Sequence, residues 1–448
     1  MRIASSTAFG VRVSASLAAM VFAGSAASGV LISWDNPGVG DWYDPANWDC
    51  GVPAAGEVLW MENGGTAVVS GGVSPVYSII LCREAGLMFT GGVFNSNSIR
   101  FGQSGTAFGE INGASTVINC NDMTVSEGAI ASVCFNHVDG TVNVNGEMSV
   151  AFDGDGAYFH DAGTVNADEI NLGFFSGSNG QYSFFGGEIN LVDLFVGVDG
   201  TGSFFQHGGV LNITEDMRVP ISSGSGKFRL IDGELNVDRV IRSSSETSSE
   251  FRMLGGEFNV REFGQGALPI DLKTEGGTFT PGGPAIGMST ICGSLDQQAG
   301  SSIRMDIDSS ASSDLVEVED EVILAGDLVL DLDYAPLGME MFVVINNLGP
   351  NPVFGTFTDQ PEGSSITATF GGSTYNFAVT YTGGDGNDVV IGACFGDATG
   401  DGVIDFDDLN AVLSNWGEPG PEGDLNGSGL VDFDDLNLVL SAWEMDCI

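Results

Sequence analysis

The chain has 448 residues and a formal net charge of −47, from 60 acidic and 13 basic side chains. This balance excludes nucleic acid and anionic membrane surfaces as partners, because both are bound by clustered Lys and Arg. Hydrophobic residues make up 43% of the chain and Gly occupies 67 positions, so we expect an ordered protein rich in turns.

Residues 1–27 have the pattern of a secretory signal peptide. Arg2 and Arg12 precede an apolar stretch at residues 13–22, and small residues follow as far as Ala27. This pattern predicts cleavage near Ala27 and a protein that is secreted or held at the cell surface. No later segment approaches the ~20 apolar residues of a membrane span, so we do not expect an integral membrane protein.

Residues 28–86 are predicted to form an N-terminal cap. This segment contains Trp34, Trp42 and Trp48 within a run rich in turn residues. The tryptophans either cover the exposed end of a β-sheet or stack on sugar rings, and covering the end is the favoured interpretation.

Residues 87–282 contain a repeat of about 23 residues, in which an asparagine lies between two apolar residues after a small residue. The repeated asparagines are Asn95, Asn119, Asn143, Asn166, Asn190, Asn212, Asn236 and Asn259. An apolar residue precedes each copy at a fixed distance: Leu87, Ile111, Phe135, Tyr158, Tyr182, Phe204, Phe228, Phe251 and Leu272. The two-residue period within each copy is that of a strand. The repeat therefore predicts a mainly β fold, a parallel, right-handed β-helix (β-solenoid) of about nine coils with stacked rings inside.

Polar residues of the repeat have two interpretations each. The asparagines either bind a ligand or satisfy backbone groups at a turn, and the second is favoured. His137, His160 and His207 fall beside the predicted ring stack, where they are either metal ligands or, more simply, capped or surface histidines.

No catalytic residue is assigned. The chain has two lysines, and Arg229 and Arg252 occupy equivalent positions in neighbouring copies, so they are expected to stack. Paired acids occur at Asp153/Asp155 and Asp168/Glu169, but no Ser/His/Asp arrangement is evident. Whether the protein is an enzyme stays open, with the balance against it.

Residues 283–392 are predicted to be β-rich, and residues 393–448 contain two copies of a twelve-residue loop followed by a helix. Oxygen donors recur at loop positions 1, 3, 5, 9 and 12, with a backbone carbonyl at position 7. The predicted ligands are Asp397, Thr399, Asp401, Val403, Asp405 and Asp408 in the first copy, and Asp424, Asn426, Ser428, Leu430, Asp432 and Asp435 in the second. This spacing predicts two Ca²⁺ ions.

Each loop is followed by an apolar stripe at helical spacing. The stripes consist of Leu409, Val412, Leu413 and Trp416, and of Leu436, Val439, Leu440 and Trp443. We expect the two stripes to pack against each other once both loops hold calcium, so that folding and metal binding are one event.

A duplicated calcium loop with only an exiting helix resembles the type I dockerin module. The resemblance implies a small calcium-folded, α-helical module that binds a cohesin-like protein or a cell-surface scaffold, in assemblies that act on polysaccharide. Cys394 and Cys447 bracket this module, and a disulfide that closes it is favoured. The other five cysteines (Cys50, Cys82, Cys120, Cys134 and Cys292) are expected to be core thiols, at least one of them free.

The segments on either side of the repeat are similar to secreted, autotransporter passenger-like β-helix proteins. Two functions are compatible with these observations. One is a secreted, non-catalytic β-solenoid scaffold that binds partners and is attached through the dockerin-like module. The alternative is a polysaccharide-degrading β-helix enzyme, a glycosyl hydrolase or lyase, that carries the same module.

Overall fold

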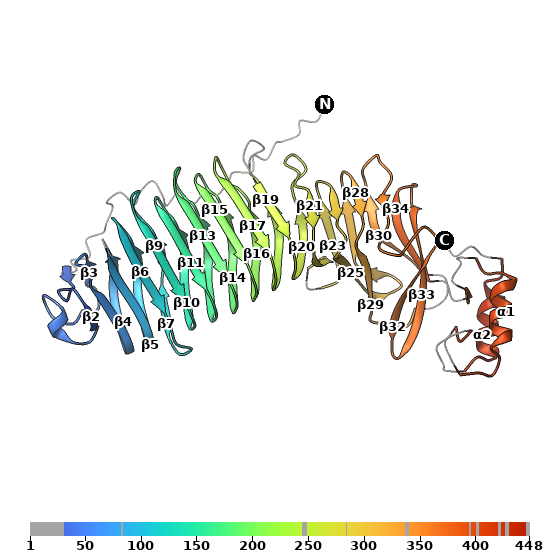
Figure 1. Ribbon diagram of the computed structural model, residues 1–448, viewed down its shortest axis with the longest axis horizontal. Coiled ribbons are helices and arrows are strands. Elements are labelled where there is room, and N and C mark those ends of the chain that lie inside the picture. The colour runs from blue at the N-terminus through green and yellow to red at the C-terminus, as the bar shows by residue number, and fades with distance from the viewer. Residues whose placement is uncertain are drawn as a thin grey trace, which may run out of the picture.

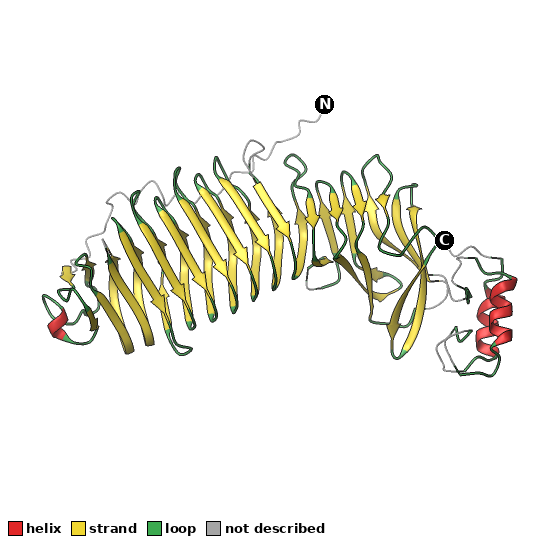
Figure 2. Ribbon diagram, viewed as in Figure 1, coloured by secondary structure: helices red, strands yellow, loops and turns green. Residues whose placement is uncertain are grey.

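A computed structural model describes residues 31–81, 84–243, 249–283, 285–336, 340–393, 396–399, 403–419, 423–425 and 430–444. These residues form an elongated β-solenoid of about 12 turns, with two short helices near one end (Figures 1 and 2). The fold is therefore mainly β, as predicted. The predicted signal peptide, residues 1–27, lies outside the described residues.

Each coil contributes strands to three faces, and strands of one face pair in parallel with their equivalents in the next coil. The first face consists of β2 (Val39–Asp41), the first parts of β4 (Thr66–Leu81) and β5 (Ala85–Phe101), β6 (Thr106–Ile111), β9 (Ser132–His137), β11 (Asp155–His160), β13 (Asn179–Phe184), β15 (Thr201–Gln206), β17 (Ser225–Leu230), β19 (Ser249–Met253), β21 (Leu272–Thr274), β24 (Leu295–Gln297), β28 (Val322–Leu324) and β31 (Phe354–Gly355).

The second face follows the first within each coil. It consists of the middle parts of β4 and β5, β7 (Val117–Cys120), the first halves of β10 (Thr141–Val150), β12 (Thr164–Leu172), β14 (Glu188–Val196), β16 (Val210–Arg218), β18 (Glu234–Ile241) and β20 (Glu257–Phe263), and then β22 (Gly277–Pro281), β25 (Ser301–Ser309) and β29 (Asp327–Leu332).

The third face completes the coil. It consists of β1 (Leu31–Ser33), β3 (Val58–Met61), the last parts of β4 and β5, β8 (Asp122–Val125), the second halves of β10, β12, β14, β16, β18 and β20, and then β23 (Met288–Ile291), β27 (Leu315–Val318) and β30 (Met341–Asn347). In β10 the second and third faces are one bent strand, whose register with β12 shifts between Val144 and Glu147. The parallel pairing continues on both sides of residues 87–282, from β1 to β30.

Antiparallel strands complete the sheet near the C-terminal end of the rod. They are β26 (Ser312–Ser313), β32 (Ser365–Phe370), β33 (Ser373–Gly383) and β34 (Asp388–Ala393). Beyond them lie α1 (Phe406–Ser414) and α2 (Phe433–Ser441), whose Val412 and Val439 share a small core with Ala378 of β33. No helix in the described part of the chain is long and apolar enough to cross a membrane.

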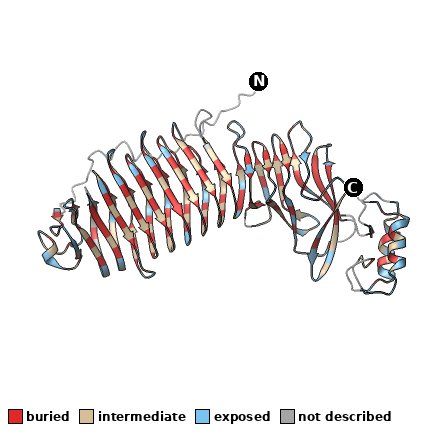
Figure 3. Cartoon of the chain, viewed as in Figure 1, coloured by how far each residue is buried: buried red, intermediate tan, exposed pale blue. Residues whose placement is uncertain are grey.

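Buried residues alternate with less buried ones along most strands of the solenoid (Figure 3). Six aromatic rings stack inside successive coils, with centroids 4.8–5.4 Å apart: Phe135, Tyr158, Tyr182, Phe204, Phe228 and Phe251. All six are buried. The predicted ring stack is therefore confirmed.

The predicted position of one residue in the apolar column, Ile111, is wrong. Gly109, not Ile111, pairs with Phe135, and Ile111 pairs with His137. Phe101 packs edge-on against Phe135 in the space that a side chain at position 109 would fill. The apolar position was assigned at a fixed number of residues before β7. The length of the segment between β6 and β7 (residues 112–116) places Gly109 and not Ile111 at that position of the coil.

His137 and His160 form a second buried stack, with ring centroids 4.3 Å apart. The Tyr158 hydroxyl lies 3.1 Å from His137 Nδ1, and the Tyr182 hydroxyl lies 3.1 Å from His160 Nδ1. Burial lowers the pKa of His137 to about 4 and that of His160 to about 3. His207 is separate: it is exposed and stacks on Phe185, 4.7 Å away.

The N-terminal tryptophans are buried and pack edge to face. Trp48 lies between Trp34 and Trp42, with centroids 4.8 and 5.0 Å away. Asp44 caps the 3₁₀ helix η1 (Pro45–Asn47) beside them by accepting a hydrogen bond from the Ala46 amide. The tryptophans therefore belong to the core of this end and present no ring face to a sugar.

The cysteines that the structure describes are free thiols. Cys120 and Cys292 are buried and Cys134 is half-buried, but Cys50 is exposed and is not the core thiol that was predicted. Cys82 lies outside the described residues, as do Cys394 and Cys447, the two cysteines of the predicted disulfide.

Candidate functional site

The first loop unit, residues 397–408, brings two buried carboxylates to one hydroxyl. The Thr399 hydroxyl lies 3.0 Å from Asp408 Oδ1 and 3.3 Å from Asp397 Oδ1. Asp408 also accepts from the Thr399 amide at 2.9 Å and from the Asp405 amide at 2.8 Å. Loop positions 1, 3 and 12 therefore lie together.

The second loop unit, residues 424–435, also folds around its last carboxylate, Asp435. Asp435 is fully buried and accepts hydrogen bonds from the Leu425 amide at 2.7 Å and the Asp432 amide at 2.8 Å. The equivalent carboxylates Asp408 and Asp435 thus fold each loop back onto the start of its helix. Asp401, Asn426 and Ser428 lie outside the described residues.

The same acids begin the helices. Asp405 caps α1 by accepting from the Asp407 amide, while Asp408 accepts from the Asp405 amide, and Asp432 and Asp435 do the same for α2. This reciprocal arrangement satisfies amides that a helix N-terminus leaves without partners. The four residues D-F-D-D therefore end each loop and also cap the helix that follows it.

The donor set fits a hard cation. The side chains that face each other are carboxylates and a hydroxyl, the ligands that Ca²⁺ prefers. Asp397, Asp408 and Asp435 are buried, and residues 305–448 contain no Lys or Arg. Buried carboxylates require a compensating positive charge or hydrogen bonds. Among the described residues no three acidic, His or Cys side chains already form a metal site.

The helix stripes are buried only in part, which corrects the sequence-based expectation. Val412 and Val439 are fully buried, and Leu409, Leu436 and Trp443 pack beside them. Leu413, Leu440 and Trp416 are exposed instead. Phe406 and Phe433, the first residues of the two helices, are 65% and 67% exposed. The two units therefore expose equivalent apolar residues, Phe406 and Leu413 in the first and Phe433 and Leu440 in the second.

The asparagines form a continuous ladder on the outside of the second face. Seven hydrogen bonds of 2.7–3.0 Å, each from Nδ2 to the Oδ1 of the preceding coil, join Asn95 to Asn259. The asparagines lie within strands and bond to each other, so the interpretation that they satisfy backbone groups at turns is wrong. Each bond leaves part of the amide's hydrogen-bonding capacity for the surface.

A column of carboxylates runs beside the ladder on the third face. Glu147, Glu169 and Asp193 pair in register, and the Asp216 amide donates to Asp193 Oδ1 at 3.0 Å. Burial, with a smaller effect of the neighbouring carboxylates, raises the pKa of Glu169 to about 7 against a hydrogen bond from Asn171. Burial also raises the pKa of Asp193.

Four arginines of the later coils are paired with acids. Arg218 and Arg239 contact Asp216 at 2.7 and 2.6 Å. Arg229 and Arg252 stack in register as predicted, and each binds a glutamate of the following coil. Each of these four arginines is therefore neutralised by a neighbouring acid.

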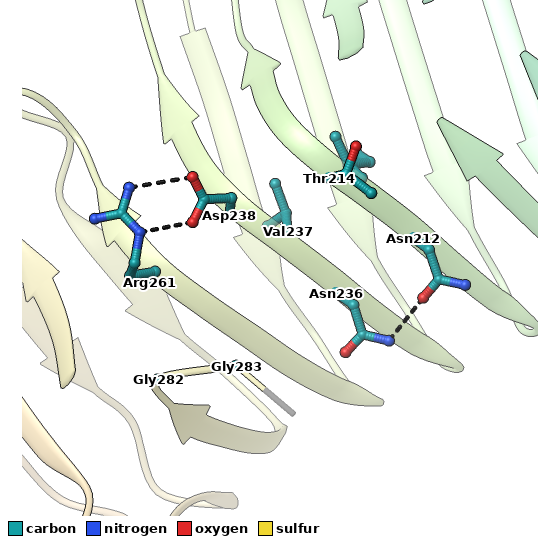
Figure 4. A pocket seen from close by; sticks show the side chains of 9 residues that line it. Asn212, Thr214, Asn236, Val237, Asp238, Arg261, Gly282 and Gly283 are labelled. Atoms are coloured by element: carbon teal, nitrogen blue, oxygen red, sulfur yellow. Dashed lines mark hydrogen bonds and ion pairs between the residues drawn. The ribbon is translucent and has the colours of Figure 1, made fainter. Parts of the chain in front are cut away.

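A hollow of about 310 Å³ opens on the second face where the ladder ends. Its walls include Asn212 and Thr214 of β16, Asn236 and Asp238 of β18, and Arg261 of β20 (Figure 4). The Arg261 guanidinium donates to both oxygens of Asp238, at 2.6 and 3.1 Å. Gly282 and Gly283, which follow β22, form the end wall.

Neither the carboxylate column nor the hollow was predicted from the sequence. Both consist of residues about 23 positions apart on outward-facing positions, so the repeat spacing was the available signal. In the sequence this spacing was recognised for the apolar column, the asparagines and the pair Arg229 and Arg252, and not for these acids. No family model, curated protein or solved structure matches the chain.

Proposed function

We propose that the protein is a secreted, non-catalytic β-solenoid scaffold that is attached through a calcium-dependent, dockerin-like module. The observation that carries this proposal is the duplication of one arrangement, with Asp408 and Asp435 buried at equivalent places in loops without a base. Two Ca²⁺ ions would supply the missing positive charge.

In the first unit Asp397, Thr399, Asp405 and Asp408 would hold the ion, together with Asp401 and the Val403 carbonyl. In the second unit Asp424, Asp432 and Asp435 would do so, together with Asn426, Ser428 and the Leu430 carbonyl. The ion supplies fixed positive charge and no reaction chemistry.

The partner of this module is a cohesin-like protein of a cell-surface or polysaccharide-related assembly. The exposed Phe406, Leu413, Phe433 and Leu440 support this proposal, because large apolar side chains at repeated surface positions mark interaction surfaces. Trp416 lies next to Phe433, with ring centroids 5.5 Å apart, and extends the same surface.

Titration calorimetry of the full chain tests the calcium sites. We expect two Ca²⁺ per chain for the unmodified protein and a loss of both in D408N/D435N. The matched control D407N/D434N removes the neighbouring exposed acids of the same helices and should keep both sites. No calcium uptake by the unmodified protein, or unchanged uptake by D408N/D435N, would refute the proposal.

Surface plasmon resonance with a panel of immobilised cohesin domains tests the partner. Binding is expected in calcium, absent in EGTA, and abolished by F406D/F433D. Binding that persists in EGTA, or the absence of binding to every domain in calcium, would contradict the docking role.

One feature favours the alternative, a polysaccharide-degrading enzyme. Glu169, with its pKa of about 7, stacks between two carboxylates, and paired carboxylates of unequal pKa perform glycoside hydrolysis. A reducing-sugar assay on soluble polysaccharides decides between the two functions, because an enzyme of this kind would lose activity in E169Q.

A further inference from the structure

We propose that the hollow at the end of the asparagine ladder binds a neutral polysaccharide, with one sugar residue in the hollow and the chain extended along the ladder. This inference goes beyond the proposed attachment through the calcium module, because the site lies wholly within the solenoid. It follows from the donor and acceptor inventory of the walls, from their charge balance and from their repeat.

The walls offer a mixture of donors and acceptors. Asn212 donates to Asn190 and accepts from Asn236, which leaves it one N–H and one lone pair. Asn236 uses its second N–H on Glu234, at 2.8 Å, and keeps a lone pair. Thr214 is exposed beside them, and its hydroxyl, which donates to the Leu191 carbonyl at 3.3 Å, keeps its acceptor capacity. A sugar hydroxyl both donates and accepts, so it complements such a surface, whereas an apolar ligand would leave these groups unpaired.

The Asp238–Arg261 pair adds a planar recognition element. The side chains are 37% and 52% exposed, so solvent or ligand can reach them. The pair presents carboxylate lone pairs beside guanidinium N–H groups, and two adjacent hydroxyls of a sugar ring can bond to both at once.

The charge balance selects a neutral ligand. Arg261 is bound to Asp238 at 2.6 Å and lies 3.5 Å from Glu262, and Arg239 is bound to Asp216. No described basic side chain of this hollow is left without an acid, so an acidic polysaccharide would meet a surface that is already neutralised within a chain of net charge −47. Neutral hydroxyls incur no such repulsion.

The size and repeat of the site indicate a chain and not a free monosaccharide. A volume of about 310 Å³ lies at the lower end of the range for small-molecule pockets, enough for one ring. From the hollow the ladder continues towards Asn95, and it offers an equivalent amide about every 4.8 Å, the spacing between paired strands. An extended polysaccharide can therefore repeat one contact along several coils.

Affinity gel electrophoresis of the full chain tests this proposal, with hydroxyethyl cellulose and galactomannan as neutral probes and alginate as the acidic probe. We expect retardation by at least one neutral probe and not by alginate. D238N/R261Q, which preserves net charge, should weaken the interaction about tenfold, and T214V should weaken it several-fold.

The matched control is R252Q/E275Q. It removes a similar two-point Arg–carboxylate pair, with Arg252 Nε 3.0 Å from Glu275 Oε1, on the first face. This control should be retarded like the unmodified protein. Equal retardation of D238N/R261Q and the unmodified protein, retardation by alginate alone, or no retardation by either neutral probe would overturn the proposal.

The test separates this site from the calcium module. EGTA should abolish docking to a cohesin domain and leave retardation by the neutral probe unchanged. Loss of retardation in EGTA would instead place the glycan contacts in the module and refute the assignment to the hollow.

Discussion

Replacing Phe204 by Ala tests the register of the solenoid directly. Phe204 is fully buried and lies between Tyr182 and Phe228, with ring centroids 4.9 and 5.2 Å away. Truncation of a buried Phe to Ala costs about 3–5 kcal/mol, and each stacked ring pair contributes about 0.5–1.5 kcal/mol beyond burial. Because the ring is stacked on both sides, we expect a loss near the upper end, about 4–5 kcal/mol.

Phe205 provides the matched control, because it is the next residue of β15 and points outwards. It is half-buried on the first face, so Phe205→Ala should cost about 1 kcal/mol. Urea unfolding followed by far-ultraviolet circular dichroism measures both losses. Since coils of a solenoid can unfold separately, hydrogen exchange of β13, β15 and β17 should accompany it and show local loss of protection in Phe204→Ala alone. Equal losses for the two variants, or a greater loss for Phe205→Ala, would refute the inward register.

Two further predictions concern ionisation. The pKa values of His137 and His160, about 4 and 3, lie below the ordinary value, so their contribution to stability is complete above pH 6.5 and is lost as the pH falls from there towards 3. NMR of the imidazoles should show neither ring titrating above pH 5, and titration near pH 6.5 would show that they are not buried. The pKa of Glu169 is raised from 4.5 to about 7, so stability is complete below pH 4.5 and falls as the pH rises through 7. The shift corresponds to about 3.4 kcal/mol, which we reduce to about 2 kcal/mol for the partial exposure of the carboxylate. Glu169→Gln should therefore raise the free energy of unfolding at pH 8 and not at pH 4, whereas Asp168→Asn, at the exposed neighbouring position, should change neither; equal effects of E169Q at the two pH values would contradict the burial of Glu169.

The solenoid could be predicted because two periods coincide in the sequence. A two-residue period places Phe204 inside and Phe205 outside, and the longer period places Phe204 above Tyr182. Ile111 was misplaced because the segment between β6 and β7 changes length, and a fixed count cannot detect this. The strand register alone does not show which hydrogen-bond partner the side-chain amide of each repeated asparagine takes.

The composition of the two loop–helix units was predictable from the sequence, but their packing was not. Loop spacing located the carboxylates Asp408 and Asp435, which the structure buries at equivalent places. The helical stripes suggested that Leu413 and Leu440 pack together. Each helix has only nine residues, and the small shared core accommodates Val412 and Val439 first, so both leucines stay at the surface. An amphipathic pattern defines a face, whereas the area of the partner decides how much of that face is covered.

Because equivalent coils stack, carboxylates at equivalent positions of neighbouring coils repel each other. Two carboxylates about 4.8 Å apart repel each other by about 3.5 kcal/mol at an effective dielectric constant near 20. At Asp216 the repulsion is offset by two guanidinium groups, whereas at Glu169 burial first, and the repulsion in addition, raises the pKa to about 7. Residues 305–448 contain no Lys or Arg, and Asp408 and Asp435 are fully buried, so the described contacts that balance these carboxylates are hydrogen bonds from backbone amides and not basic side chains. The proposed Ca²⁺ ions would add positive charge at these loops. Chelator and alkali should therefore destabilise different parts of the chain: EGTA the units at 397–408 and 424–435, and alkali the coil that contains Glu169.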